Sequence, residues 1–546
     1  MGNGITGNWA GYTTVSPGNA VFAPLIGGTR WTTETLTYSI PDGTTWRATN
    51  YSTSDEWASW SALNSTGQQA VHAVLADISR IIGINFTYID DNEDRAGDLR
   101  FALTGAIDAD RNLGWAYMPG GTPAAGDVWM AANQHTDDGF YSFNPTVGSW
   151  DYKVLIHEIG HALGLDHPFE NDPGWAASPH APLHYSVMNY GSHGGGSYTI
   201  APTSLSVLDV RALWRLYGRN TTASAGNDTY TYSGTGKYLE VLWDAGGIDT
   251  IDYSAATTGG VINLRPNTWS RMGAPVRRDG TEISNIHIID DGARDTADII
   301  ENAIGGAGAD VITGNTANNV LRGGAGNDTL SGAQGNDILD GGTGDDRMAG
   351  GMGNDVYIVD STADRVIEYA RRGNDLVRTS VTLPALPRNV ERMQLIGRAA
   401  INATGNALAN TLTGNAAGNR LDGGGGNDVL RGGGGADILT GGAGRDRFRF
   451  LNLRETGDTI TDFAAAEDRL VFRAGAFGVA RGALSSASFQ IRLNSGEATR
   501  APVRFVFNRA ERALYHDADG AGGAAAVRVV TLGNRAMLGR ANIFIT

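Results

Sequence analysis

The string HEIGHALGLDH, from His157 to His167, combines histidines and a glutamate at spacings suited to metal chemistry. On a helix, His157 and His161 lie one turn apart on the same face, where both imidazoles can reach one metal ion at ~2.0–2.1 Å. Glu158 lies beside that ion without being a ligand, which suits a general base acting on zinc-bound water. Gly164 can end the helix in a left-handed conformation, and the reversed chain brings His167 to a third ligand position. These residues predict a zinc site with one open position for catalysis.

A shorter HExxH pair would be a weaker signal, because two histidines on a helix can be purely structural. The longer string is far more specific, since a glycine and a third histidine must also fall at fixed positions. We therefore prefer the catalytic interpretation. The segment KVLIHEIGHALGL is predicted to form the buried helix that carries the ligands.

Other elements around this helix are visible as periodic patterns. Apolar residues recur at helical spacing in QQAVHAVLADISRII, which predicts an amphipathic helix packed on a sheet. The segments TLTYSI and NFTYID alternate between polar and apolar residues, as half-buried strands do. The first 218 residues are therefore predicted to be a mixed α and β domain.

From Gly305 the chain changes to glycine-rich rows of nine residues, the first being GGAGADVIT. Glycine permits turns with positive φ, the sixth residue is usually a carboxylate, and the eighth is apolar and predicted to point inward. A glycine-rich tract is often a flexible linker. The fixed period and the apolar column argue against a linker here. The rows of two sets begin at Gly305, Gly314, Gly323, Gly332, Gly341 and Gly350, and at Gly405, Gly414, Gly423, Gly432 and Gly441.

The rows follow the G-G-x-G-x-D-x-U-x pattern of the calcium-binding parallel β-roll of RTX proteins, which they resemble. One coil takes two rows, so aspartates 18 positions apart should stack and share an ion. The predicted calcium ligands are Asp310, Asp328, Asp337, Asp346, Asp355, Asp428, Asp437 and Asp446. Asp437 is expected to face only Asn419. Rows with Asn319, Asn410 or Asn419 should bind calcium weakly or not at all.

Composition narrows the class of protein further. The 546 residues exceed the usual size of one domain, and 77 glycines match the repeats. A net charge of −16 argues against nucleic acid and suits cation binding, although plain solubility explains it equally well. With no cysteine, zinc must sit on His, Asp or Glu. Neither a signal peptide nor a membrane-spanning run is recognisable, so no membrane insertion is expected.

Downstream, the segment YSVMNY places Met188 where a Met-turn would lie and Tyr190 two residues later. A lone methionine is more often core filler. Together with HEIGHALGLDHP, however, this segment resembles the serralysin family of metzincins. That resemblance implies a secreted zinc endopeptidase in which Met188 lies beneath the zinc and Tyr190 is a movable fourth protein ligand and oxyanion donor. It also implies that a substrate strand lies along GDVWMAA, expected to be the edge of the sheet.

The expected fold class is an α+β metzincin domain followed by an all-β calcium-binding parallel β-roll and a carboxy-terminal β cap. The expected domains are an N-terminal extension or short propeptide (1–22), the catalytic domain (23–218), a β linker (219–304), the first roll (305–360), a spacer (361–404), the second roll (405–450) and a cap with an uncleaved secretion signal (451–546).

The resemblance implies one catalytic Zn²⁺ and several structural Ca²⁺ ions. The implied partners are protein or peptide substrates, a proteinaceous inhibitor and the type I secretion apparatus. Nucleic acid is not expected as a partner. An alternative is an RTX adhesin or surface-layer protein whose protease domain is inactive or processes only itself, which the double roll favours and the intact Glu158 opposes.

Overall fold

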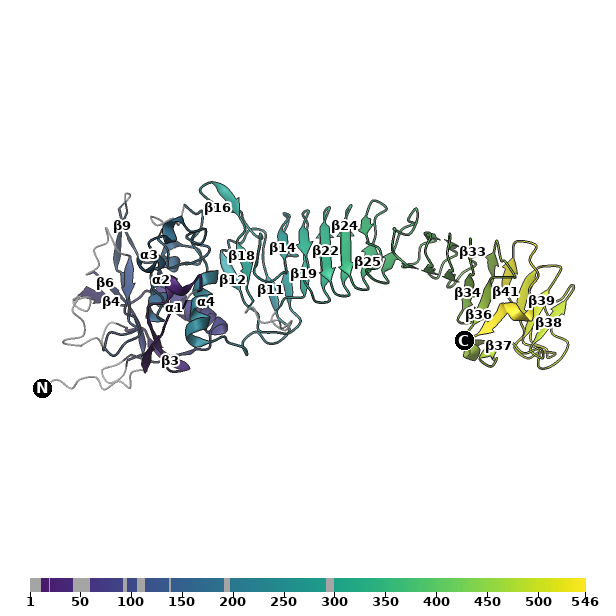
Figure 1. The fold of residues 1–546 in the computed structure, drawn as a ribbon, viewed down its shortest axis with the longest axis horizontal. Helices are drawn as coiled ribbons and strands as arrows, with labels where there is room; N and C mark the ends of the chain where they lie inside the picture. Colours follow the sequence, from purple (N-terminus) through teal and green to yellow (C-terminus); the bar gives the residue numbers. More distant parts are fainter. Residues whose placement is uncertain are drawn as a thin grey trace. The chain divides into compact units, whose positions relative to one another are not determined.

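The computed structural model describes residues 11–18, 20–42, 59–91, 96–105, 113–136, 139–190, 197–290 and 299–546 (Figure 1). The chain divides into two compact units, one of residues 1–256 and 260–300 and the other of residues 257–259 and 301–546. The division lies close to Gly305, the predicted start of the roll. The finer predicted boundaries stay predictions.

The first unit is built on a mostly parallel sheet with strand order β5-β3-β6-β8-β7. Strands β3, β5, β6 and β8 are parallel, whereas β7 runs antiparallel to β8, and β4 pairs antiparallel with β6. The predicted strands TLTYSI and NFTYID are β3 and β5. The bounds are β3 Thr35–Ser39, β4 Trp60–Ser61, β5 Asn85–Tyr88, β6 Leu99–Thr104, β7 Gly114–Ala116 and β8 Val128–Ala131.

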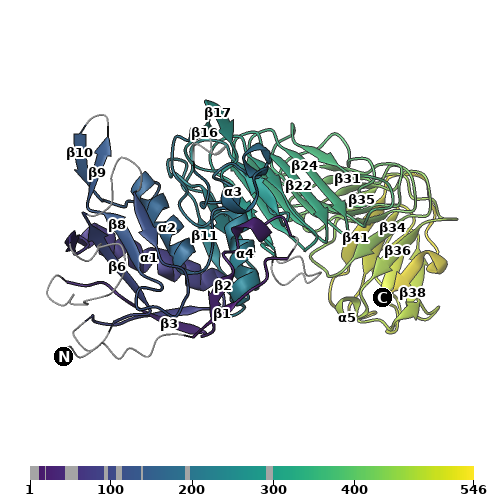
Figure 2. The ribbon, with the colours of Figure 1, turned by 60° about the vertical axis from the view of Figure 1, so that its left-hand side comes forward.

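Three longer helices complete this unit: α1 Ser65–Ile81, α2 Trp150–Ala162 and α4 Val207–Tyr217. Helix α1 is the predicted amphipathic helix, and Val71, Leu75 and Ile78 on its apolar face are buried. The side chain of Asn64 caps its start by accepting the N–H of Gly67 at 2.8 Å. Figure 2 shows α1 and α2 beside strands β6 and β8.

The remaining elements of the first unit are short. Strands β1 and β2, β9 and β10, and β16 and β17 form antiparallel pairs, β11 pairs with β13, and β18 pairs with both β12 and β15. Their bounds are β1 Tyr12–Thr14, η1 Ala23–Leu25, β2 Thr29–Trp31, β9 Asn133–Thr136, β10 Gly139–Ser142, α3 Pro168–Asn171, η3 Trp175–Ala177, β11 Thr229–Thr231, β12 Glu240–Leu242, β13 Thr250–Asp252, β14 Val261–Asn263, β15 Thr268–Ser270, β16 Val276–Arg278, β17 Thr281–Ile283 and β18 Ile286–Ile288.

The second unit contains the predicted parallel β-roll, so the expected fold class is confirmed. Successive rows alternate between two parallel sheets, β19-β21-β23-β25 and β20-β22-β24-β26, and each strand pairs with the strand two rows later. The apolar column of the eighth positions is fully inside, from Ile312 to Tyr357 at 0–1% exposure. The bounds are β19 Asn302–Ile304, β20 Val311–Thr313, β21 Val320–Ala325, β22 Thr329–Gln334, β23 Ile338–Thr343, β24 Arg347–Met352, β25 Val356–Val359 and β26 Arg365–Ile367.

The spacer adds strands to this roll, because β27 pairs with β25, β28 with β27, and β30 with β28. The same sheet continues through β30, β32, β34 and β36 of the second set of rows, and a new sheet that begins with β29, β31, β33 and β35 forms the other side and runs into the cap. The bounds are β27 Leu376–Thr379, β28 Arg392–Leu395, β29 Ala403–Thr404, β30 Thr411–Thr413, β31 Arg420–Asp422, β32 Val429–Arg431, β33 Ile438–Thr440, β34 Arg447–Phe450, β35 Asp458–Ile460, β36 Arg469–Phe472, α5 Ala474–Phe477, β37 Gly482–Ala483, β38 Phe489–Arg492, β39 Phe505–Asn508, β40 Ala513–His516, β41 Val527–Leu532, η5 Arg540–Asn542 and β42 Ile543–Ile545.

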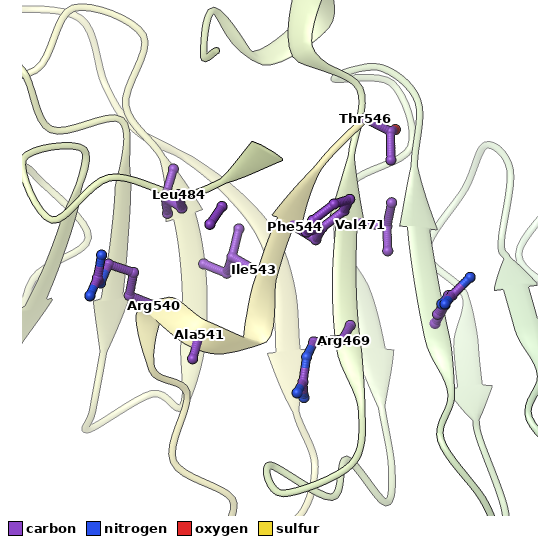
Figure 3. A pocket seen from close by; sticks show the side chains of 10 residues that line it. Arg469, Val471, Leu484, Arg540, Ala541, Ile543, Phe544 and Thr546 are labelled. Carbon is purple, nitrogen blue, oxygen red and sulfur yellow. The ribbon is translucent and has the colours of Figure 1, made fainter. Parts of the chain in front are cut away.

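A cavity of about 510 Å³ lies in the cap, and Figure 3 shows Arg469, Arg540, Val471 and Phe544 among the side chains that line it. Its lining contains no histidine or carboxylate side chain. Across the part of the chain that the structure describes, no helix is long and apolar enough to cross a membrane.

Candidate metal centre

Helix α2 is the buried helix that the sequence predicts, and both of its ends are well defined. The side chain of Ser149 caps its start by accepting the N–H of Tyr152 at 3.1 Å. At its end, Gly164 has φ of 93°, and the N–H groups of Gly164 and Leu165 bond back to the carbonyls of His161 and Gly160 at 2.8 and 2.9 Å. This is a Schellman turn, which reverses the chain as predicted.

The turn brings the three predicted histidine ligands together. Nε2 of His167 lies 3.1 Å from Nε2 of His157 and 3.0 Å from Nε2 of His161. Two nitrogens bound to one zinc ion at ~2.0–2.1 Å in tetrahedral geometry would lie ~3.3 Å apart. The three nitrogens therefore converge nearly as a shared zinc ion would require.

The other ring nitrogen of each histidine is held by an acceptor. Nδ1 of His157 donates to the carbonyl of Val187 at 2.9 Å, and Nδ1 of His161 donates to the carbonyl of Leu165 at 2.8 Å. Nδ1 of His167 donates to Oε1 of Glu170 at 2.9 Å. Because Nδ1 carries the proton in each ring, the Nε2 lone pairs are left for a metal.

Burial also favours the neutral imidazole that binds metal. It lowers the pKa of His157 well below its usual value and that of His161 to about 4, and neighbouring cationic groups act in the same direction. The pKa of His167 is lowered by burial too, although Glu170 opposes that shift. Three neutral Nε2 lone pairs facing one another are repulsive unless a cation lies between them, so this donor set fits zinc.

Glu158 lies within α2, against the backbone of strand β7. A Cβ added to Gly114 would be 3.0 Å from Cγ of Glu158, so glycine makes room for this side chain. Glu158 is 4% exposed, and its Oε2 has no hydrogen-bond partner among the described residues. Burial raises its pKa to about 8, against the opposing effect of Lys153. A buried carboxylate with a free oxygen is suited to accept a proton from water.

The side chain of Tyr190, two residues after Met188, lies against the histidine ligands. Its hydroxyl lies 2.7 Å from Nε2 of His167, and its ring stacks on His157 with centroids 5.4 Å apart. The ring of Phe169 packs against both, 5.1 Å from the ring of His167 and 5.2 Å from that of Tyr190. The predicted ligand position of Tyr190 is therefore geometrically accessible.

Met188 is fully buried beneath the histidines, where a Cβ on Gly160 would meet its sulfur at 2.8 Å. The turn that carries it is fixed by Asp209 of α4, which the sequence interpretation missed. Asp209 accepts hydrogen bonds from Ser186 Oγ at 2.6 Å and from the N–H of Val187 at 2.8 Å. The same carboxylate caps the start of α4, so one buried acid positions the Met-turn and a helix.

Lys153 is a second residue that the sequence interpretation missed. It is 5% exposed, and its Nζ lies 3.4 Å from both Nδ1 of His157 and the carbonyl of Asn189. Its Nζ also lies 5.7 Å from the centroid of the Tyr190 ring. Burial lowers its pKa to about 8. Lys153 precedes His157 by one helical turn, which places it on the face of α2 that carries the ligands. This spacing is the sequence signal that could have identified it.

The predicted edge strand is wrong. The segment GDVWMAA forms β8, which lies inside the sheet between β6 and β7. The edge is β7, Gly114–Ala116, whose three residues Gly-Trp-Ala are too short to show an alternating pattern. This edge strand also lies against Glu158.

In the roll, the predicted aspartate stacks are present. Oδ1 of Asp328 accepts the N–H of Asp310 at 2.7 Å, and Oδ1 of Asp346 accepts that of Asp328 at 2.8 Å. The pairs Asp337–Asp355 and Asp428–Asp446 are joined in the same way, at 2.8 and 2.9 Å. The other carboxylate oxygen, Oδ2, is buried and has no hydrogen-bond partner within the described chain in these aspartates: Asp328, Asp337, Asp346, Asp355, Asp428, Asp437, Asp446 and Asp458. These aligned free oxygens suit bound calcium.

The expectation that Asp437 faces only Asn419 is wrong. Its N–H also donates to Oδ1 of Asp458 at 3.0 Å, 21 positions later. The same bonds extend the other stacks to Asp364, Asp375 and Asp468, which were also missed. Asp375, Asp458 and Asp468 follow inserted residues and lie 20, 21 and 22 positions after their partners. A search at a fixed spacing of 18 residues therefore overlooks these three.

In the rows that have asparagine at the sixth position, the side chain forms different hydrogen bonds from those of the aspartates. Nδ2 of Asn319 donates to the carbonyl of Glu301 at 2.7 Å, and Nδ2 of Asn419 donates to that of Ile401 at 2.7 Å. The amide of Asn410 reaches the carbonyls of Val390 and Glu391 at 3.5 and 3.4 Å. The amide N–H donor of asparagine thus occupies the position at which other rows have a carboxylate oxygen. This agrees with the prediction that these rows bind calcium weakly or not at all.

A further acidic group lies in the first unit, formed by two aspartates of the segment WDAGGID and by Asp228, before strand β11. Carboxylate oxygens of Asp228, Asp244 and Asp249 lie within 4.8 Å of one another. Oδ1 of Asp249 accepts the N–H of Asp228 at 2.7 Å, and Oδ1 of Asp244 accepts that of Gly246 at 2.7 Å. The signal that could have found this group is the pair of glycines between two aspartates.

Comparisons with known proteins find a matching repeat family and several similar proteases. The family described as "RTX calcium-binding nonapeptide repeat (4 copies)" matches residues 304–339, 323–357, 331–366 and 404–448. Serralysin of Proteus mirabilis is 34% identical over 228 residues, 37% of this chain and 42% of that protein. Metalloprotease AprA of Pseudomonas entomophila is 32% identical over 241 residues, 38% of this chain and 45% of that protein.

Metallopeptidase AprA of Pseudomonas marginalis is 32% identical over 285 residues, 47% of this chain and 56% of that protein. The chain thus spans about half the length of the curated relatives that it matches. Among solved structures, the extracellular lipase LipA of Serratia marcescens matches at 18% identity over 50% of this chain and 45% of that chain, with a TM-score of only 0.13. The chain is thus similar to serralysins and AprA metalloproteases over about half of their length, and its repeats match the RTX family.

Proposed function

We propose that this chain is a secreted zinc-dependent endopeptidase that hydrolyses peptide bonds in proteins and whose roll folds by binding calcium. One observation carries the proposal above all. Three neutral Nε2 atoms converge within 3.0–3.1 Å beside Glu158, a buried carboxylate with an unpartnered oxygen. The names of the relatives, serralysin and metalloprotease, support the same activity.

His157, His161 and His167 would hold the zinc ion. When bound, zinc supplies Lewis-acid chemistry, which lowers the pKa of water toward ~7 and polarises a carbonyl. Glu158 takes the proton of the attacking water through its free Oε2 and delivers it to the leaving amine. The Tyr190 hydroxyl donates a hydrogen bond to the oxyanion that develops on the scissile carbonyl. Strand β7 aligns the substrate by backbone pairing.

Removal of zinc tests this proposal most directly. Treating the protein with 1,10-phenanthroline in millimolar calcium is expected to abolish casein cleavage, and added zinc should restore it. Calcium keeps the roll folded during the treatment, so loss of activity reports the histidine site alone. Casein cleavage that persists after zinc has been shown to be absent would refute the assignment.

Replacing Tyr190 by Phe is expected to lower kcat by ~10²-fold, because one donor to the oxyanion is lost. The zinc content should not change, since three histidines remain. Tyr198→Phe is a matched control, because the Tyr198 hydroxyl also bonds a histidine nitrogen, Nδ1 of His184 at 2.8 Å, outside the metal site. Equal kcat values for the two variants would exclude a role for Tyr190 in the reaction.

The roll supports the rest of the proposal. Calcium-dependent folding suits a chain that leaves the cell through a type I secretion apparatus and folds in a calcium-rich medium. Protein substrates and a proteinaceous inhibitor are the expected partners. An RTX adhesin with an inactive protease domain is the alternative, and the complete donor set around Glu158 opposes it.

A further inference from the structure

Three buried acids meet where the first roll block passes into the spacer. Carboxylate oxygens of Asp355, Glu368 and Asp375 all lie within 4.8 Å of one another. The side chains are 1%, 7% and 1% exposed. Asp355 belongs to the last nonapeptide row of the first block, but Glu368 and Asp375 lie between residues 304–366 and 404–448, the two stretches that match the RTX repeat family. The glutamate is a residue type that the nonapeptide pattern does not contain.

The oxygen atoms of Asp355 have different surroundings. Oδ1 accepts the N–H of Asp337 at 2.8 Å, which ties it to the preceding coil. Oδ2 is buried without a hydrogen-bond partner in the described chain. A Cβ on Gly350 would lie 2.1 Å from this Oδ2 and 2.5 Å from the Tyr357 hydroxyl, so both atoms border the same gap. Since that hydroxyl donates to Oε1 of Glu368, the free oxygen lies on the side of the other acids.

Only neutral groups bond to these carboxylates. Oε2 of Glu368 accepts the N–H of Tyr369 at 3.1 Å, and Oδ1 of Asp375 accepts the N–H of Asp355 at 2.8 Å. Among the described residues, no lysine, arginine or histidine forms an ion pair with any of the three. Buried carboxylates are costly unless a cation compensates them, and the protein supplies none.

We propose that Asp355, Glu368 and Asp375 bind a calcium ion, which extends the ion ladder of the roll into the spacer. The donors are all carboxylate oxygens, which hard cations prefer, and nitrogen and sulfur donors are absent from the cluster. Two oxygens on one calcium ion, at 2.3–2.6 Å each, can lie up to ~5 Å apart, which the observed separations satisfy. The ion joins β25 to the spacer segment that leads to β27.

This site rests on the proposed calcium binding of the roll only through Asp355, and it is independent of peptide hydrolysis. Its test is a count of calcium ions per full-length chain, by native mass spectrometry after calcium has been removed and restored. Glu368→Gln and Asp375→Asn should each bind one ion fewer than the unaltered protein. The double variant should also lose only one, because both residues serve the same ion.

Glu511→Gln is the matched control, since Glu511 likewise accepts a tyrosine hydroxyl, that of Tyr515, but is exposed. It should keep the full count. An unchanged count in either single variant, or the loss of two or more ions in the double variant, would overturn the proposed site. If the unaltered protein binds no calcium at all, the calcium role of the whole roll fails with it.

Discussion

Replacing Glu158 by Gln is expected to lower the rate of peptide hydrolysis by roughly 10²- to 10⁴-fold, because an amide cannot take the proton of the attacking water. The bound zinc should remain, since Glu158 is not one of the converging donors. The measurement is kcat on casein or a peptide library, together with zinc content by atomic absorption. Undiminished turnover by a zinc-loaded variant would remove Glu158 from the mechanism.

The same substitution should not destabilise the protein. Burial disfavours the charged form of Glu158, as its raised pKa of about 8 shows, and the neutral amide of Gln removes that buried charge. In zinc-free protein, the Tm of Glu158→Gln should therefore equal or exceed that of the unaltered chain. Glu282→Gln, which removes an exposed ion pair with Arg271, is a control that should leave kcat unchanged.

Removing calcium at about pH 8 is expected to unfold the roll, with loss of most of its β circular dichroism. Each ion present at 100 times its Kd contributes ~2.7 kcal/mol, so several ions contribute more than the stability of a typical domain. Without calcium, the stacked carboxylates of the roll are left buried and uncompensated. Spectra that are identical with and without chelator at this pH would refute the calcium dependence.

The calcium-free protein should regain structure when it is acidified. Burial raises the pKa of Asp328, Asp337 and Asp428 to about 7, whereas the unfolded value is 3.8. The folded state therefore binds more protons, and this stabilisation is complete below about pH 4 and is lost as the pH rises through about 7. In chelator, ellipticity should be larger at about pH 5 than at pH 8. With calcium present, acid should instead weaken the fold, because protons displace the ions.

The sequence predicts well those features that are local or strictly periodic. The helix of His157 and His161, the reversal at Gly164 and the inward column of the roll depend on spacings of a few residues, and the structure shows all of them. Aspartates 18 positions apart are stacked as predicted, because every coil in that stretch has the same length.

Features that depend on contacts between distant segments could not be predicted. Asp209 lies more than twenty residues after the Met-turn that it anchors, and no pattern connects the two. The edge position of β7 depends on the order of strands across the sheet, which three residues cannot encode. Asp375 and Asp458 were missed because insertions change the coil length to 20 and 21 residues.

The asparagine rows distinguish the amino-terminal coil of each block from the coils that follow it. Asn319 lies near the start of the first set of rows, and Asn410 and Asn419 open the second. Their amides close the opening coils by hydrogen bonds to backbone carbonyls, with no need for an ion. Each block thus begins with a coil that protein hydrogen bonds alone hold closed, so its carboxylates and any calcium they bind lie in the coils next to it and after it.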